Sequence, residues 1–290
     1  MSWRKIAGLT AAGITFLGVA YAFQSKAHEH TWREYPAFEY NNFPIPPDYQ
    51  EKTEWAYARL MYPTMPGVHG RRGFGRFGVT DWTQGGRGAY WTMDYPRSDR
   101  HFSAAVRRLT RIHARSVEQP INLNDGDDVY NWPWLYVAHV ESWDLTDSMI
   151  KKLHEYIDRG GFFYVDDFWG DSGWAIFKQT MDRILPGSQA EDIPDTDPIF
   201  HVLFDLKDKF MVANHNEYVR TGQPYHNIPG GTEAHWRGIR DAKGRIVVVM
   251  NFNSDVGDSW EWADRPEYPE KYSNLGMRIS TNYTAYAMTH

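Results

Sequence analysis

Apolar residues along the chain occur in short continuous runs, separated by segments with helical spacing. A short continuous apolar run is typical of a strand that is buried on both faces. The predicted strands are residues 54–62, 132–140, 162–165, 239–241 and 245–251. A turn at Ala242-Lys243-Gly244 would join the last two, as a hairpin or as adjacent strands.

Four helices are predicted between and after these strands, because apolar residues recur there at every third or fourth position. Ser98 is expected to cap the first helix and Thr146 the second, which would end at Gly160. The third helix should stop at Pro186, and the last should begin at Pro269. Strands that alternate with helices form a mostly parallel sheet with helices on both faces, so the predicted fold class is α/β.

The N-terminal residues have the features of an export signal. Arg4 and Lys5 precede an uncharged run at 6–23, which contains Ala20-Tyr21-Ala22, a sequence that suits signal peptidase. We therefore expect a signal peptide at 1–22, or an uncleaved membrane anchor formed by residues 6–23. Both alternatives place the rest of the chain outside the cytoplasm, in the periplasm or on the extracytoplasmic face of the membrane.

The mature chain is expected to consist of an extended arm and one domain. Residues 23–52 contain Phe43-Pro44-Ile45-Pro46-Pro47, which must be extended because each proline restricts its own φ and the residue before it. Residues 53–290 would form a single α/β domain. A long segment at 63–96 with eight glycines is inserted in it, and a loop of that length is usually functional or disordered.

Composition and charge exclude several classes of function. The 290-residue chain has no cysteine, which excludes disulfides, cysteine-bound zinc, iron–sulfur clusters and a thiol nucleophile. Its formal net charge of −6 argues against nonspecific nucleic-acid binding, which depends on an excess of basic residues. Aromatic residues make up 16% of the chain, which is enough bulk for a large core and argues against disorder.

Polar residues cluster where two of the predicted strands end. His139 and Glu141 lie at the end of one strand, whereas Asp166, Asp167 and Trp169 follow the next. The ligand crevice of a parallel sheet lies beyond the carboxyl ends of its strands, so these residues are candidates for ligand binding. Crowded carboxylates can also split their pKa values and act as acid and base. In the structural alternative, Asp166 or Asp167 caps the next helix or pairs with an arginine of the glycine-rich segment.

Arg71 and Arg72 belong to the glycine-rich segment and complete the set of ligand-binding candidates. With Arg76 and Arg87 they would form a lid that carries four arginines over the acidic crevice; the alternative is a loop ordered by salt bridges. The G-x-G-x-x-G sequence at 73–78 does not predict nucleotide binding, because neither the strand before it nor the helix after it is present.

No metal site and no cofactor are predicted. Residues 251–258 resemble the start of an EF-hand calcium loop, but Gly257 is one place late and Trp262 stands where the bidentate glutamate should be. Asp255 and Asp258 are therefore expected to cap a turn between a strand and a helix. The twelve histidines include no H-E-x-x-H motif, and the G-x-S-x-G motif of hydrolases is also absent.

Several motifs together resemble those of one protein family. They lie at residues 91–102, 107–112, 160–170, 193–201, 235–239 and 258–264. Over about residues 53–290, the chain resembles a bacterial family of unknown function, number 4159 among the domains of unknown function.

The resemblance implies a fold similar to that of class I glutamine amidotransferases, with a flavodoxin-like sheet, and it implies no established chemistry. Amidotransferases carry a cysteine on an elbow between a strand and a helix. The strand after Gly160-Gly161 resembles theirs, but Asp166-Asp167 follow it in place of a thiol. Glutaminase chemistry by the family mechanism is therefore excluded, because its nucleophile must be a sulfur.

Three functions are open at this point, and so is the question whether the protein is an enzyme. The first is an exported, non-catalytic domain that binds a polar ligand or an envelope protein. It is favoured because the predicted crevice is acidic and aromatic, as a binding site can be, but contains no nucleophile. The second is a hydrolase of a glycan, with two carboxylates among Glu141, Asp166 and Asp167 as acid and as base or nucleophile. The third is a purely structural envelope protein.

Overall fold

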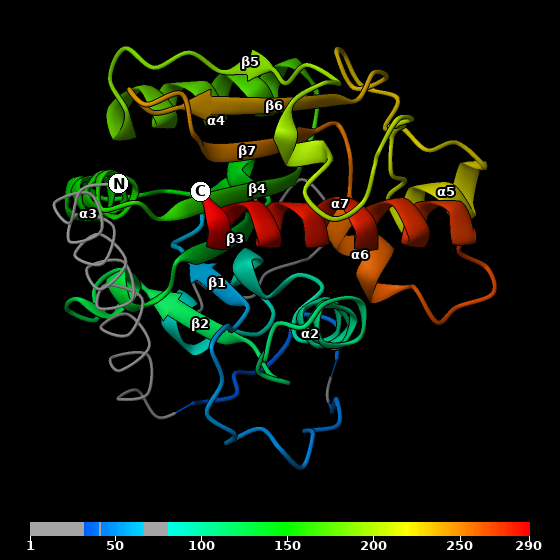
Figure 1. Cartoon of the computed structure of the whole chain (residues 1–290), viewed down its shortest axis with the longest axis horizontal. Coiled ribbons are helices and arrows are strands. Elements are labelled where there is room, and N and C mark those ends of the chain that lie inside the picture. The colour runs from blue at the N-terminus through cyan, green and yellow to red at the C-terminus, as the bar shows by residue number, and fades with distance from the viewer. Residues whose placement is uncertain (1–31, 41, 67–80) are drawn as a thin grey trace, which may run out of the picture.

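The computed structural model describes residues 32–40, 42–66 and 81–290, which contain a seven-stranded sheet in the order β2-β1-β3-β4-β7-β6-β5 (Figure 1). The strands are β1 (Ala58–Met61), β2 (Gln119–Asn122), β3 (Trp134–Ala138), β4 (Phe162–Phe168), β5 (Glu191–Asp192), β6 (His235–Arg240) and β7 (Ile246–Phe252). β1, β2, β3, β4 and β7 run parallel, whereas β6 is antiparallel to β7 and β5 to β6. The predicted α/β class and mostly parallel sheet are therefore confirmed.

Helices cover both faces of this sheet. They are α2 (Arg97–Leu109), α3 (Asp147–Asp158), α4 (Gly170–Ile184), α5 (His215–Thr221), α6 (Val256–Glu261) and α7 (Glu270–Thr289). Successive strand residues point to opposite faces. Leu135 of β3 packs in the same buried cluster as Leu153 of α3, whereas Trp134 packs with Trp260 of α6 and Ile279 of α7. Large apolar clusters therefore cover both faces of the sheet.

The five predicted strands correspond to β1, β3, β4, β6 and β7, with different bounds. β4 continues to Phe168, so Asp166 and Asp167 belong to the strand itself. The predicted hairpin is confirmed, because β6 and β7 pair and Gly244 N donates to Asp241 O at 2.9 Å in the turn. β2 and β5 were not predicted, because β2 is a polar edge strand that contains a proline and β5 has only two residues.

The helix caps follow the sequence in part. Thr146 caps α3 as predicted, because its side chain accepts a backbone hydrogen bond from the first turn. The prediction that Ser98 caps α2 is wrong, since α2 begins at Arg97 and its N-cap residue is Pro96. The Ser98 hydroxyl is buried inside the first turn, where it accepts a hydrogen bond from Arg59 at 3.1 Å. The Ser98 side chain therefore takes part in a long-range contact with β1 and does not cap the helix.

The two remaining predicted helices have the expected ends. α4 stops at Ile184, before Pro186, and α7 begins directly after Pro269. The short helix α5 is not predicted, and α6 is expected only as a helix of unspecified bounds near Asp255, because neither is long enough to show a repeating apolar face.

The described part of the arm, residues 32–40 and 42–52, contains no helix or strand and packs against α2. Arg100 of α2 donates to Glu34 Oε1 at 2.6 Å and to the carbonyl oxygen of Phe43 at 3.2 Å. These contacts tie the arm on both sides of Glu39, which thereby reaches the carboxyl ends of the parallel strands.

Some predictions fall on residues outside the described ranges. They concern the signal peptide or anchor at 1–22, Arg71 and Arg72, and the glycine motif at 73–78. Among the helices that are described, none combines the length and the hydrophobicity that crossing a membrane requires.

Candidate functional site

The ends of β3 and β4 bring four of the predicted site residues together. The two strands are parallel neighbours with Ala138 opposite Asp166, and His139 N donates to Asp167 O at 3.2 Å. His139 and Glu141 follow β3, whereas Asp166 and Asp167 lie in β4. These side chains therefore lie together at one edge of the sheet, but Asp166 and Asp167 are only 0% and 2% exposed.

His139 and Asp167 form a buried ion pair. Nε2 of His139 lies 2.8 Å from Oδ2 of Asp167, and Nδ1 lies 3.4 Å from Oε1 of Glu141. Burial by itself would lower the pKa of His139, but the Asp167 carboxylate and Glu141 outweigh it and raise the pKa well above its usual range. Burial would raise the pKa of Asp167, but His139 and the Trp169 hydrogen bond lower it. The imidazolium and the carboxylate therefore stabilise each other's charged form.

Asp166 has a different environment, because four hydrogen-bond donors converge on its carboxyl group. They are Tyr136 Oη at 3.0 Å, Asn251 Nδ2 at 3.0 Å, Val256 N at 3.3 Å and Gly257 N at 2.7 Å. The last two are the first amides of α6, so Asp166 satisfies donors that the helix leaves free. Burial and the nearby Asp167 charge raise the pKa of Asp166 to about 7. This carboxyl anchors α6 and has no free face for a ligand.

Trp169 and Glu141 complete the set of described candidates. Trp169 Nε1 donates to Asp167 Oδ1 at 2.6 Å, and its ring lies edge-on to His226 with 4.4 Å between centroids. Trp169 is 8% exposed, so it orients Asp167 and offers no open aromatic platform. Glu141 is half-buried, and its Oε2 atom is buried without a hydrogen-bond partner among the described residues.

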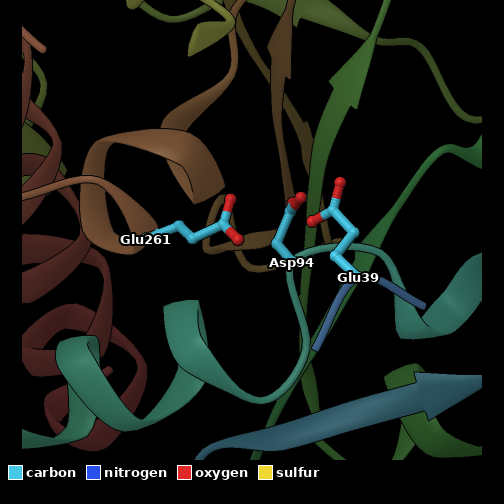
Figure 2. A group of neighbouring side chains, drawn as sticks. All are labelled: Glu39, Asp94 and Glu261. Atoms are coloured by element: carbon cyan, nitrogen blue, oxygen red, sulfur yellow. The ribbon is translucent and has the colours of Figure 1, made fainter. Parts of the chain in front are cut away.

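Two further groups of carboxylates, not predicted as sites, adjoin this cluster. In the first, one oxygen each of Asp94, Asp167 and Asp255 lie within 4.8 Å of one another, and all three residues are buried. In the second, oxygens of Glu39, Asp94 and Glu261 are equally close, and Glu39 is exposed (Figure 2). Asp94 precedes α2 and Asp255 is the N-cap residue of α6, so distant segments meet here.

Within these groups Asp167 pairs with His139, but among the described residues no lysine or arginine forms an ion pair with the other carboxylates. Burial raises the pKa of Asp94 well above its usual range, and the charges of Glu39 and Asp167 raise it further. Burial is also the main reason why the pKa values of Asp255 and Glu261 are raised. The folded environment therefore favours the neutral form of Asp94, Asp255 and Glu261.

Backbone strain is concentrated at the same edge of the sheet. The described residues other than glycine that have positive φ are Asp94 (60°), His139 (55°), Asp167 (45°) and Asn253 (57°). The Asn253 side chain stabilises the local backbone, because its Oδ1 atom accepts a hydrogen bond from Gly170 N at 2.8 Å. Such conformations cost of order 1–3 kcal/mol each and tend to cluster at functional sites. Their grouping around the carboxylates therefore marks this edge as the candidate functional site.

Local sequence patterns point only in part to the carboxylates of these two groups. Asp255 was expected to cap a turn, and its side chain does accept from Asp258 N at the start of α6. Its second role beside Asp94 and Asp167 is visible only in the fold. Glu39 lies in the proline-rich arm and Glu261 at the end of a short helix, positions where no local pattern predicts a site.

Comparison with protein families identifies the family of the chain. Residues 81–288 match the family described as "Domain of unknown function (DUF4159)". Because the match covers well over half of the sequence, the chain belongs to this family, as its motifs indicated. No curated protein matches the chain.

Proposed function

We propose that the protein is an exported binding domain that holds a polar ligand at the carboxyl ends of β3 and β4, on a fold similar to class I glutamine amidotransferases. The sheet supports the fold assignment, because β2-β1-β3-β4 followed by parallel β7 is the flavodoxin-like order. Ligands of such sheets bind where the strand order reverses, between β1 and β3. His139 directly follows β3 and therefore stands at that place.

Glu141 carries the proposal. One carboxylate oxygen contacts His139, whereas the other is buried and has no hydrogen-bond partner among the described residues. A buried acceptor without a donor is unfavourable by about 1–3 kcal/mol, so a ligand that supplies the donor gains this amount. The ligand that fits is neutral or cationic and carries hydroxyl, amide or amine groups, such as an envelope sugar or a peptide. An anionic ligand would be repelled by Glu141 and its acidic surroundings.

Binding is favoured over glycan hydrolysis by the state of the two aspartates. A glycosidase needs two carboxyl groups that face the substrate. Asp166 is surrounded by four donors and Asp167 is held by His139 and Trp169, and neither is more than 2% exposed. A purely structural role would leave the unpaired Glu141 oxygen without a reason.

Thermal-shift measurements test the binding function. The full-length protein would be screened against amino sugars, neutral oligosaccharides and cationic peptides, with matched anionic peptides as controls. We expect a ligand with donor groups to raise the melting temperature, and Glu141→Gln to weaken that ligand by about tenfold, the effect of one hydrogen bond to a charged group. The exposed Asp144→Asn should bind as the wild type does. Equal affinity of Glu141→Gln and wild type would contradict the proposal.

Export is tested separately. In a bacterial host, N-terminal sequencing of the protein from the periplasmic fraction should begin at Phe23 if the signal peptide is cleaved. Recovery of the intact chain in the membrane fraction would support the anchor at 6–23, and recovery in the cytosol alone would contradict export.

A further inference from the structure

Asp94 is buried without the donors that other carboxyl groups of this protein receive. It is 5% exposed, and its Oδ2 atom has no hydrogen-bond partner among the described residues. Asp166, which is equally buried, is satisfied by four donors. A buried and unsatisfied carboxyl oxygen needs an explanation such as a bound ion. The same oxygen-rich group contains Asp167 and Asp255.

We propose that Asp94, Asp167 and Asp255 bind a hard divalent cation of the Ca²⁺ or Mn²⁺ type. Their oxygens lie within 4.8 Å of one another, the largest separation that two oxygens bound to one ion at about 2.4 Å can have. The donor set consists of carboxylate oxygens, which hard cations prefer. Among the described residues, no lysine or arginine forms an ion pair with any of the three.

Two of the ligands are already oriented by neighbours outside the group. Trp169 Nε1 fixes Asp167 Oδ1, and Asn214 Nδ2 donates to Asp255 Oδ2 at 2.8 Å. Each carboxylate oxygen has two lone pairs, so an oxygen that accepts one hydrogen bond can still coordinate an ion. Contacts of this kind hold metal ligands in position in many proteins.

The second carboxylate group lies between the proposed site and the protein surface. Glu39 is exposed and its carboxylate lies within 4.8 Å of those of Asp94 and Glu261. Asp94 lies between Glu261 and Glu39 in Figure 2 and belongs to both groups. Neighbouring carboxylates therefore connect the proposed site with an exposed residue.

This inference deepens the proposed binding function and rests on the same end of the sheet. The cation would neutralise the inner carboxylates, and a ligand could still contact the Glu141 Oε2 atom when the cation is absent. The cation titration uses no organic ligand, so its failure would leave the proposed binding function untouched. The thermal-shift screen, repeated in the presence of EDTA, tests that binding function without a cation.

Isothermal titration calorimetry tests the site. The full-length protein, freed of metal with EDTA and dialysed, would be titrated with CaCl₂, MnCl₂ and MgCl₂. We expect saturable binding of Ca²⁺ or Mn²⁺, weakened more than about tenfold in Asp94→Asn and in Asp255→Asn. Asp264→Asn, which changes an exposed partner of Arg97, should bind as the wild type does. Absence of saturable binding in the wild type, or unchanged affinity in both variants, would overturn the proposal.

A second measurement is independent of whether those variants fold. Tb³⁺ is a luminescent substitute for Ca²⁺. An ion bound to Asp167 would lie close to Trp169, because Trp169 Nε1 donates a hydrogen bond to Asp167 Oδ1 at 2.6 Å. We expect tryptophan excitation of the wild-type protein to produce Tb³⁺ emission that Ca²⁺ displaces and that Trp169→Phe lowers. Emission that is absent, or that Trp169→Phe leaves unchanged, would contradict this position for the ion.

Discussion

Arg59 of β1 and Asp99 of α2 form an ion pair inside the core. Arg59 Nε donates to Asp99 Oδ2 at 2.8 Å, Nη2 contacts the other oxygen, and the two side chains are 1% and 0% exposed. Arg59 Nη1 also donates to the carbonyl oxygens of Trp91 at 3.1 Å and of Met93 at 3.3 Å. The pair therefore fixes the segment that presents Asp94, the neighbour of Met93, to the site.

Asp99→Asn should destabilise the protein strongly, because it leaves the Arg59 guanidinium buried without its counter-charge. Breaking a buried pair in this way costs about 3–5 kcal/mol. Urea unfolding followed by circular dichroism measures the change. Asp264→Asn removes the partner of Arg97 but acts on an exposed carboxylate, so its effect should not exceed about 1 kcal/mol. Similar stability of the two variants would show that the buried pair contributes little.

Gly161→Ala should destabilise the start of β4. A Cβ atom at this position would overlap the ring of Tyr156, whose hydroxyl donates to Phe162 O at 3.1 Å and whose side chain is buried. Overpacking of this kind costs about 1–3 kcal/mol. Thermal unfolding measures it.

Gly173→Ala is the matched control for that substitution. Gly173 lies in α4, and its added Cβ would make only an ordinary contact with Glu141 Cβ at 3.6 Å. Because alanine favours helix over glycine by up to about 1 kcal/mol, this variant should be as stable as the wild type or more so. Equal losses in the two variants would contradict the steric explanation.

Asp166→Asn should lower the free energy of unfolding and leave the affinity for a ligand at Glu141 unchanged. The substitution replaces one acceptor oxygen with an NH₂ group that faces the amide of Val256 or Gly257, so α6 loses part of its anchor. We expect a loss of about 2–4 kcal/mol, which denaturant unfolding measures. Asp171→Asn, an exposed residue in the first turn of α4, should lose less than about 1 kcal/mol. A fully stable Asp166→Asn would mean that the carboxyl group is free for another role.

Alkaline pH should unfold the protein through its buried tyrosines. Burial is the main cause that raises the pKa well above 10 for a set of phenols that stay neutral in the folded state. They are Tyr57, Tyr62, Tyr95, Tyr136, Tyr156, Tyr164, Tyr268 and Tyr283. Because the unfolded phenols ionise near pH 10, the folded state binds more protons above that pH and the free energy of unfolding falls as pH rises.

Each such phenol contributes a loss of about 1.4 kcal/mol per pH unit above 10. The free energy of unfolding of an ordinary domain is on the order of 5–15 kcal/mol. Several ionising phenols together therefore remove that stability within about one to two pH units above 10. Absorbance at 295 nm and far-ultraviolet circular dichroism should therefore change in one cooperative step. Full phenol ionisation with an intact dichroism spectrum would contradict the burial of these rings.

The sequence predicted the parts of this molecule that depend on local pattern. The apolar runs located β3 and β4, and parallel pairing of those two strands was enough to bring His139, Glu141 and Asp167 together. Thr146 was identified because a cap needs only the residues of its own first turn.

The rest could not be predicted, because it depends on segments that meet only in the folded chain. Tyr40 and Glu261 are 221 positions apart and share a hydrogen bond. No periodicity connects the arm with α6, so Glu39 and Glu261 had no signal as neighbours. Ser98 failed as a cap for the same reason, since Arg59 from a distant strand occupies its hydroxyl.

The position of β1 has a practical consequence for anyone who shortens this protein. β1 pairs with both β2 and β3, although it precedes them by many residues in the chain. A recombinant fragment that starts downstream of it would retain the other strands but leave a gap in the sheet, with β2 detached and the edge of β3 open to aggregation. Expression boundaries should therefore lie upstream of residue 32, so that the first strand and the arm that covers α2 are both retained.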